Sequence, residues 1–364
     1  MNTILKLEHI QKYYGNEGNI TKAIKDISFS VEAGEFLGIM GASGSGKTTL
    51  LNCISTIDTV SAGHIFLDGT DITEINPKSL ARFRRENLGF VFQDFNLLDT
   101  LTISENIALA LAINKVPAGS VESRILDIAG KLNISDILNK YPYQVSGGQK
   151  QRVAFARALA PNPNLLLLDE PFAAIDAKVR QELRSWLKDM IERLGVTSIF
   201  VTHDQSEAIE VADEIIITNK GRIEQIGSPI DIYQHPQTAF SASFFGQTTT
   251  LDDYTKFKTF DVVDNVDRAV IRPEFVKVTK LSETTAQKAS VSVGEVIKTS
   301  FRGDNIEIAV KCDGGTVYAY RGLDETPITV GEKVNVFLYR LFITKGDEVQ
   351  ILRNKSLQEE SVII

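Results

Sequence analysis

An apolar segment that runs into a glycine-rich turn constrains this chain more than any other stretch. Phe36–Met40 contains no charged residue, and the sequence Gly-Ala-Ser-Gly-Ser-Gly-Lys-Thr-Thr follows it directly as residues 41–49. A turn of this kind between a strand and a helix points backbone N–H groups inward, where they hold phosphate oxygens. In this pattern Lys47 supplies a positive charge to the β and γ oxygens, and the Thr48 hydroxyl binds magnesium. The stretch predicts a nucleoside-triphosphate site in an α/β protein.

A glycine- and serine-rich linker is the alternative interpretation of this stretch. A linker does not explain the apolar residues that follow at helical spacing, which include Leu50, Leu51 and Ile54. We therefore expect a strand, a phosphate loop and a helix in succession. The candidate nucleotide-binding residues of the loop are Gly41, Ser43, Gly44, Ser45, Gly46, Lys47, Thr48 and Thr49.

Composition favours a globular protein with two domains. The chain has 364 residues, of which 43% are hydrophobic, and this is enough for sizeable packed cores. Its net charge of −8 provides no general attraction to nucleic acid or to an anionic membrane surface. No apolar run approaches the ~20 residues of a membrane-spanning helix. The first residues lack the apolar stretch of a signal peptide, so we expect any link to a membrane to be made through a partner.

Cysteine and histidine usage indicates neither a disulfide framework nor a structural zinc site. Cys53 and Cys312 are the two cysteines, and they lie far apart in the sequence, which is typical of proteins from a reducing cytoplasm. The four histidines lack the spacing of zinc ligands, so we expect no structural zinc.

Strand-like and helical segments alternate up to about Pro236, which predicts an α/β fold with a largely parallel sheet. The expected strands are Ile27–Val31, Glu35–Met40, Leu88–Phe92, Asn164–Leu168 and Ser198–Thr202. The expected helices begin at Lys47 and span Gly147–Leu159 and Lys178–Leu194. A helical pattern dominates between Leu101 and Tyr141, so we expect a helical subdomain over about residues 95–160.

Short alternating strands replace helices in the last third of the chain. The polar stretch Gln247–Asp253 resembles a linker, and we place a domain boundary there, giving domains 1–246 and 247–364. The turn Asp313-Gly-Gly315 separates two of the later strands. A small all-β barrel fits this spacing best. The expected strands are Ser290–Val296, Ile306–Val310, Thr316–Tyr320, Lys333–Leu338 and Gln350–Leu352.

Two carboxylates follow the most apolar strand of the chain. Leu165–Leu168 is four leucines in succession, and Asp169 and Glu170 come directly after it. Ligands bind at the carboxyl ends of strands in open parallel sheets. Asp169 suits a magnesium ion, and Glu170 suits polarisation of an attacking water. An ordinary acidic strand end is the alternative, which the phosphate loop upstream makes the weaker interpretation.

A second helix start with anion-binding character lies at Val145–Gln149, whose sequence is Val-Ser-Gly-Gly-Gln. Unpaired N–H groups and the helix dipole favour an anion at such a position. This segment resembles the signature sequence of ATP-binding cassette (ABC) transporter ATPases, which completes the nucleotide site of the other subunit in a dimer. The resemblance assigns Ser146, Gly147, Gly148 and Gln149 to ATP binding in trans. A simple helix cap is the alternative.

The resemblance extends from about Ile4 to Gly246 and implies roles for further residues. Tyr14 matches the aromatic residue that stacks on adenine, with Tyr13 as a rival. Gln93, in Phe-Gln-Asp, matches the glutamine that contacts magnesium. Asp176, in Ala-Ile-Asp, matches the loop that crosses the dimer interface, and His203 matches the histidine that contacts the γ-phosphate.

Two subfamilies of ABC ATPases are similar to different parts of the chain. Residues up to about Gln151 resemble the ATPases of antimicrobial-peptide-resistance and lipoprotein-release systems. Phe172–Arg180 and Lys220–Pro229 are similar to sulfate-type importer ATPases, in which a transport-associated (TOBE-like) barrel follows the cassette. Ile271–Glu274 (Ile-Arg-Pro-Glu) matches the usual entry of that barrel. The additional C-terminal length favours the importer.

The resemblance to importer ATPases implies an ATP-hydrolysing subunit that uses ATP and Mg²⁺, with Lys47, Glu170 and His203 as catalytic residues. Thr48, Gln93 and Asp169 would bind the metal. We expect a homodimer bound to two integral-membrane permease subunits on the cytoplasmic face of the membrane, served by an extracytoplasmic solute-binding protein. A sulfate-like oxyanion or another small solute is the expected substrate, and no nucleic acid is expected.

Three alternatives remain open. The first is the ATPase of a peptide-resistance or lipoprotein-release system. The second is a soluble ABC ATPase that acts on nucleic acid or ribosomes, although this chain has one phosphate loop, no heptads and a negative charge. The third, compatible with the importer, treats residues 254–364 as a ligand-sensing regulatory module.

Overall fold

The computed structural model describes residues 2–15, 19–173, 176–283 and 290–357. Ala174 and Ile175, which belong to the predicted interface loop, lie outside the described residues. The chain divides into two compact units, Met1–Ile230 and Asp231–Ile364. Among the described residues, no helix is both long and apolar enough to cross a membrane.

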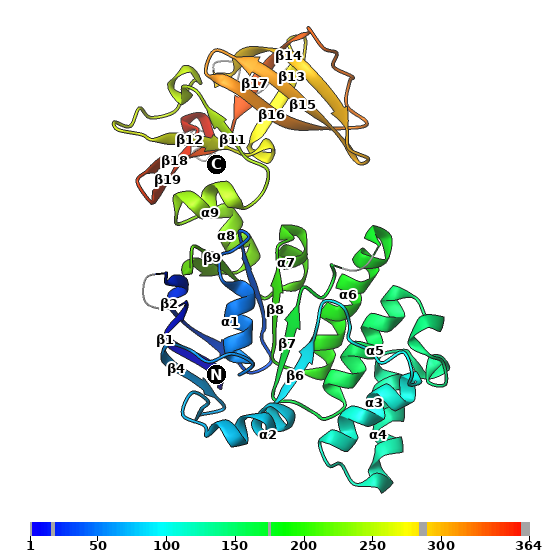
Figure 1. The fold of residues 1–364 in the computed structure, drawn as a ribbon. Coiled ribbons are helices and arrows are strands. Elements are labelled where there is room, and N and C mark those ends of the chain that lie inside the picture. The colour runs from blue at the N-terminus through cyan, green and yellow to red at the C-terminus, as the bar shows by residue number, and fades with distance from the viewer. Residues whose placement is uncertain (1, 16–18, 174–175, 284–289, 358–364) are drawn as a thin grey trace, which may run out of the picture. The chain divides into compact units, whose positions relative to one another are not determined.

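The first unit is built on a ten-stranded sheet with the strand order β5-β4-β1-β2-β10-β9-β3-β8-β7-β6 (Figure 1). Neighbouring strands from β9 to β6 pair in parallel. Every residue of β3 and β8 is buried, as expected for parallel strands whose two faces are both covered. The predicted parallel sheet is confirmed. The parallel strands are β3 (Phe36–Gly41), β6 (Leu88–Val91), β7 (Leu165–Asp169), β8 (Ser198–Thr202) and β9 (Glu214–Asn219).

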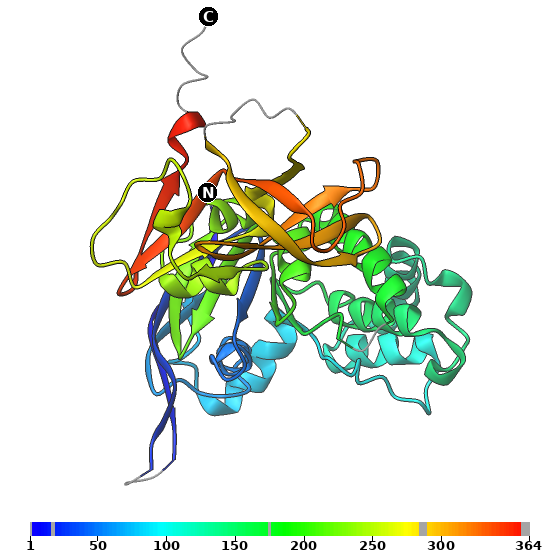
Figure 2. The ribbon, with the colours of Figure 1, turned by 90° about the horizontal axis from the view of Figure 1, so that it is seen from above.

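An antiparallel part continues the same sheet. Figure 2 shows β1 and β2 extending as a long two-stranded ribbon. Of this part, only the apolar end of β2 is predicted from the sequence. Register irregularities between Leu7 and Ile10 and between Ile10 and Lys12 interrupt the alternation of buried and exposed residues along β1. The strands are β1 (Thr3–Tyr14), β2 (Thr21–Glu32), β4 (Ala62–Leu67), β5 (Thr70–Asp71) and β10 (Arg222–Gly227).

Helices cover the parallel strands and form a separate group at one side. In Figure 1, α3, α4 and α5 gather beside β6, and they form the predicted helical subdomain. Thr102 caps α3 with a reciprocal bond to Glu105, which explains where this helix begins. The helices of the unit are α1 (Lys47–Ile54), α2 (Pro77–Asn87), α3 (Ile103–Ile113), α4 (Ala118–Lys131), α5 (Gly147–Leu159), α6 (Ala177–Leu194) and α7 (Gln205–Val211). Helix α8 (Pro229–Gln234) spans the division between the units.

The second unit contains a four-stranded sheet, β11-β12-β18-β19, and a five-stranded sheet, β13-β17-β14-β15-β16. The five-stranded sheet curls until its end strands, β13 and β16, come into contact. Arg321 of β16 joins the two strands by donating to the carbonyl of Val278 in β13 at 2.8 Å. The predicted β-barrel is confirmed. The elements are α9 (Ala239–Phe244), β11 (Thr249–Leu251), β12 (Arg268–Ile271), β13 (Val276–Lys280), β14 (Ser292–Phe301), β15 (Asn305–Cys312), β16 (Gly315–Gly322), β17 (Lys333–Leu338), β18 (Arg340–Lys345) and β19 (Glu348–Arg353).

The stretch Gln247–Asp253 is not a linker, so that prediction is wrong. It contains β11, which pairs with β12, and Leu251 is buried in the core of the second unit. Threonine is a polar residue that also favours strands, so the polarity of this stretch was misleading. The two compact units divide between Ile230 and Asp231. The domain boundary that the sequence places after Gly246 stays a prediction.

Candidate nucleotide-binding site

The phosphate loop connects β3 to α1 in a conformation that needs its glycines. A Cβ atom on Gly41 would lie 2.1 Å from the carbonyl oxygen of Thr218. Gly46 has φ of 101°, in the left-handed region, and a Cβ there would lie 2.6 Å from the carbonyl oxygen of Ala23. The hydroxyls of Ser45 and Thr218 lie 2.9 Å apart, which ties the loop to β9. The loop is therefore held by the sheet beneath it.

Lys47 is buried and points back across the loop. Its ammonium donates to the carbonyl oxygens of Gly41 at 2.9 Å and Ala42 at 3.1 Å. Burial lowers the pKa of Lys47, and the charges of Glu170 and Asp169 partly oppose this shift. The fold thus brings Lys47 near two carboxylates that are distant in sequence. Thr48 is exposed and Thr49 is half-buried in the first turn of α1.

The two carboxylates stand at the carboxyl end of β7. Burial raises the pKa of Asp169, and the neighbouring Glu170 raises it further, while Lys47 opposes both. Glu170 has φ of 46°, a backbone conformation that non-glycine residues seldom adopt. Its N–H donates to the carbonyl of Val201 in β8 at 3.0 Å, which fixes the residue between two strands. Unusual backbone of this kind gathers at functional sites.

His203 follows β8 and contacts Glu170. Its Nδ1 lies 3.0 Å from Oε1 of that carboxylate. The adjacent pairing of β7 with β8 explains this contact, because both residues follow the carboxyl ends of their strands. The structure therefore brings together four predicted catalytic or metal-binding residues, namely Lys47, Asp169, Glu170 and His203.

Gln93 and Tyr14 lie at the ends of two other strands. Gln93 is exposed and follows β6, the neighbour of β7. Tyr14 ends β1, is 42% exposed, and its hydroxyl donates to Asp58 at 2.6 Å. Burial raises the pKa of Tyr14, and a side-chain hydrogen bond with Thr49 opposes this rise. Because Thr49 directly follows Thr48 of the phosphate loop, Tyr14 borders that loop. The rival Tyr13 donates instead to Gln11.

Ser146–Gln149 form the start of α5. Ser146 accepts a bond from the N–H of Gln149 at 3.3 Å, and its own N–H donates to Gln149 Oε1 at 3.0 Å. A Cβ on Gly148 would lie 3.0 Å from Val179 on α6. A cavity of about 480 Å³ opens here, lined by Ser146, Gly148, Gln149, Arg152, Val179, Glu182 and Leu183.

The signature helix and the phosphate loop lie apart within the chain. Helix α5 packs against α3, α4, α6 and β6, whereas α1 packs against β2, β3, β7 and β8 (Figure 1). In the part of the chain that the structure describes, the hydrogen bonds of Lys47 go to Gly41 and Ala42, and those of Ser146 and Gln149 join these two residues to each other. Asp176 is exposed and occupies the N-cap position of α6 without a side-chain capping hydrogen bond.

Sequence reasoning missed residues that support the site. Arg184 on α6 and Asp204 and Glu207 around α7 form an ionic cluster next to His203. The spacing of Asp204 and Glu207 matches a helix N-cap signal, which would have located the start of α7. Asp58, the partner of Tyr14, and Thr218, the partner of Ser45, carried no recognisable motif.

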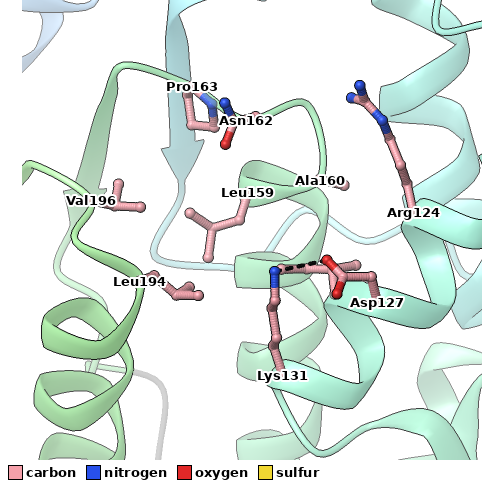
Figure 3. A pocket seen from close by; sticks show the side chains of 10 residues that line it. Arg124, Asp127, Lys131, Leu159, Ala160, Asn162, Pro163, Leu194 and Val196 are labelled. Atoms are coloured by element: carbon pink, nitrogen blue, oxygen red, sulfur yellow. Dashed lines mark ion pairs between the residues drawn. The ribbon is translucent and has the colours of Figure 1, made fainter.

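A separate pocket of about 360 Å³ lies among the ends of α4, α5 and α6 (Figure 3). In Figure 3, Asp127 and Lys131 face each other as an ion pair of 2.8 Å, opposite the apolar Leu159, Leu194 and Val196. None of its lining residues is a predicted site residue. His64 lies with Asp71 and Glu74, and their potential ligand atoms lie within 4.8 Å of one another, so the expectation of no structural zinc stays a prediction.

Comparisons with known proteins agree with this geometry. A family model described as "ABC transporter" matches residues 24–173, and one described as "TOBE domain" matches residues 269–338. The sulfate/thiosulfate import ATP-binding protein CysA of a Synechocystis species is 39% identical over 318 residues, covering 86% of each chain. CysA of Gloeobacter violaceus is 43% identical over 245 residues, covering 67% of this chain and 68% of the relative.

Solved structures of ATP-binding cassettes resemble the first unit. A dimeric post-hydrolysis state of the cassette MJ0796 with ADP and phosphate has a TM-score of 0.56 and 36% identity, covering 62% of this chain and 99% of that one. The cbiO1 protein of Clostridium perfringens, part of the ABC transporter complex cbiONQ, has a TM-score of 0.59 and 29% identity, covering 65% and 92%.

The fold and the site together define a phosphate-loop nucleoside triphosphatase. The chain belongs to the ATP-binding proteins of ABC transporters, and it is an ABC-type ATPase.

Proposed function

We propose that this chain is the ATP-hydrolysing subunit of an importer for a sulfate-like oxyanion. The observation that carries the proposal is the convergence of Lys47, Asp169, Glu170 and His203 at the carboxyl edge of one parallel sheet. The importer part rests on the relatives, whose names describe sulfate/thiosulfate import, and on the TOBE-like second unit.

The residues of the site divide the work of phosphoryl transfer to water. Lys47 and the N–H groups of the loop bind the phosphates of ATP and offset their charge. His203 contacts the γ-phosphate, and Glu170, 3.0 Å from His203, accepts a hydrogen bond from the attacking water and orients it. No covalent intermediate is needed, because positioning and electrostatics lower the barrier. Tyr14 stacks against the adenine.

A magnesium ion fits the donor set of this site. Asp169 and Glu170 place two carboxylates beside one buried ammonium, and burial raises the pKa of Asp169 in the protein alone. The exposed hydroxyl of Thr48 and the exposed amide of Gln93 complete an oxygen-rich set that suits a hard cation. When bound, magnesium supplies positive charge to the β and γ oxygens.

A homodimer is part of the proposal. Ser146–Gln149 present a helix N-terminus and a cavity but have no described contact with the phosphate loop of their own chain. In a dimer these residues would face the γ-phosphate bound by the partner, and Asp176 would lie near the interface. We propose two integral-membrane permease subunits and an extracytoplasmic solute-binding protein as further partners, with this subunit at the cytoplasmic face.

The experiment that tests the proposal uses the complex from native membranes. The tagged chain should co-purify with two integral-membrane subunits, which are either two copies of one protein or two different proteins. After reconstitution into liposomes with the binding protein, sulfate should stimulate ATP hydrolysis and should be taken up, and Lys47→Ala in this chain should abolish both. Stimulation by peptides or lipoproteins and not by sulfate would instead identify the peptide-resistance or lipoprotein-release class.

A further inference from the structure

The histidine of the site is held by its neighbours on both sides. Thr202, the last residue of β8, donates its hydroxyl to the carboxylate of Glu207 and accepts the N–H of Asp204 at 3.0 Å. Asp204 caps α7, accepting bonds from the N–H groups of Ser206 at 2.8 Å and Glu207 at 3.3 Å. The backbone position of His203 therefore depends on where Asp204 and Glu207 lie.

Both of these carboxylates converge on one arginine from another helix. Arg184 lies on α6, and its Nη2 is 3.3 Å from Asp204 Oδ2 and 3.4 Å from Glu207 Oε1. Its Nη1 lies 3.5 Å from Glu210, one turn further along α7. The Arg184 side chain is only 11% exposed and that of Glu207 only 5%, so water screens these charges poorly.

Removal of this guanidinium would leave three carboxylates together along α7, of which Asp204 would keep a second arginine, Arg180, at 3.9 Å. A partly buried charge that loses its partner is strongly unfavourable, so the segment would move to relieve it. Because Thr202 and Asp204 adjoin His203 in the chain, that movement would carry the imidazole away from Glu170. Catalysis by positioning is sensitive to displacements of about 1 Å.

We infer that Arg184 is a positioning residue for ATP hydrolysis, which acts by fixing the loop that carries His203 against Glu170. The inference rests on the proposed role of His203 at the γ-phosphate. It also gives α6 a part in the reaction, because this helix begins next to Asp176 and carries Arg184 two turns later. A shift of α6 would be transmitted to His203 through this ionic cluster.

The test is a double-mutant cycle in the full-length protein, read by ATP turnover under saturating and limiting ATP. Arg184→Met should lower kcat about 10- to 100-fold and change the affinity for ATP, measured by a fluorescent analogue, less than about twofold. In the His203→Ala background, Arg184→Met should change kcat by less than about twofold, because its effect passes through that histidine. Arg184→Lys should recover part of the loss.

Two further variants keep the test decisive if Arg184→Met folds poorly. Asp204→Asn retains a good helix cap but removes the charge that faces Arg184 at 3.3 Å and Arg180 at 3.9 Å, and it should reproduce the loss of kcat. Arg193→Met, on the same helix but bonded to the carbonyl of Lys131 at 2.7 Å, should leave kcat unchanged.

The outcomes separate the inference from the function on which it rests. If His203→Ala hydrolyses ATP at the parental rate, the proposed role of His203 fails and the inference fails with it. If His203→Ala is impaired but Arg184→Met lowers kcat by the same factor with and without it, Arg184 acts independently of His203. That result overturns the inference alone. A rise in KM without a fall in kcat for Arg184→Met overturns it as well.

Discussion

Asp169 stands out at the scale of single residues because its surroundings oppose its charge. Burial raises the pKa of this carboxyl, and the adjacent Glu170 adds repulsion that the ammonium of Lys47 only partly offsets. A raised pKa in the folded state means that the fold disfavours the ionised form. The protein tolerates this arrangement at the position where a divalent cation would bind.

Asp169→Asn should therefore stabilise the protein in the absence of nucleotide and abolish its activity. The midpoint of thermal unfolding should rise by roughly 2 °C, the shift expected for about 1 kcal/mol in a domain of this size. Calorimetry without nucleotide and an ATPase assay with magnesium measure the two effects. Asp189→Asn, which removes an exposed carboxylate on α6, should alter neither. A lower unfolding temperature for Asp169→Asn would contradict this reading of the site.

Tyr14→Ala should weaken ATP binding by about 1–2 kcal/mol, because it removes a ring on which adenine stacks. Tyr14→Phe keeps the ring and loses only the hydrogen bond to Asp58, so its affinity should stay close to that of the parent. Titration calorimetry measures both. A loss in Tyr13→Ala and none in Tyr14→Ala would assign the adenine contact to the neighbouring residue.

The residues that could be predicted from sequence are those whose role depends on local spacing. The phosphate loop and the pair Asp169-Glu170 follow apolar strands directly, and the parallel sheet brings them together as expected. Arg184 could not be predicted, because its role depends on the packing of α6 against α7, which no local pattern encodes. Asp58, bonded to Tyr14, was missed for the same reason.

At the scale of elements, α9 belongs with the strands that follow it. Ala242 of α9 lies in the core of the second unit. The guanidinium of Arg272, which follows β12, donates to the carbonyl oxygen of Ala242 at 3.3 Å. Thr238 forms an isolated bridge with Glu348 of β19. These contacts explain why the compact units divide before α9 and not at Gly246.

A fragment of residues 1–230 should fold alone and hydrolyse ATP, whereas a fragment of residues 1–246 should associate or precipitate. The longer fragment retains α9 without β18 and β19, so the apolar side of this helix would be exposed to water. Size-exclusion chromatography and ATP turnover of both fragments measure the difference. A soluble, active 1–246 beside an insoluble 1–230 would support the domain boundary predicted from the sequence.

The buried strands of the parallel sheet were predicted well, and the shortest strands of the second unit were missed. The expected strand Ser198–Thr202 and the expected helix Gly147–Leu159 match β8 and α5 residue for residue. The short strands β11 and β12 carry too few residues for a periodic pattern. Strand β12 forms because β18 supplies backbone partners from distant sequence, and β11 pairs in turn with β12.

At the scale of the whole molecule, the proposed homodimer leads to a paired test. Glu170→Gln removes the charge that orients water but keeps the shape of the site, so ATP should bind and persist. This variant should form a dimer with ATP and magnesium, as light scattering would measure. A second substitution, Ser146→Arg, would place a bulky cation where the partner's phosphate docks and should return the protein to monomers.

The control for that experiment is Ser123→Arg, which adds the same charge at an exposed position on α4. In the Glu170→Gln background it should leave the dimer intact. Monomers of the Glu170→Gln protein at saturating ATP, or an undisturbed dimer carrying Ser146→Arg, would refute the shared nucleotide site.

The two carbonyl bonds of Lys47 have a consequence for turnover. An ammonium that already donates to Gly41 and Ala42 must exchange these acceptors for phosphate oxygens, so the loop itself competes with the nucleotide. The free energy of phosphate binding at this lysine is thus the difference between its hydrogen bonds to phosphate oxygens and its hydrogen bonds to the two loop carbonyls.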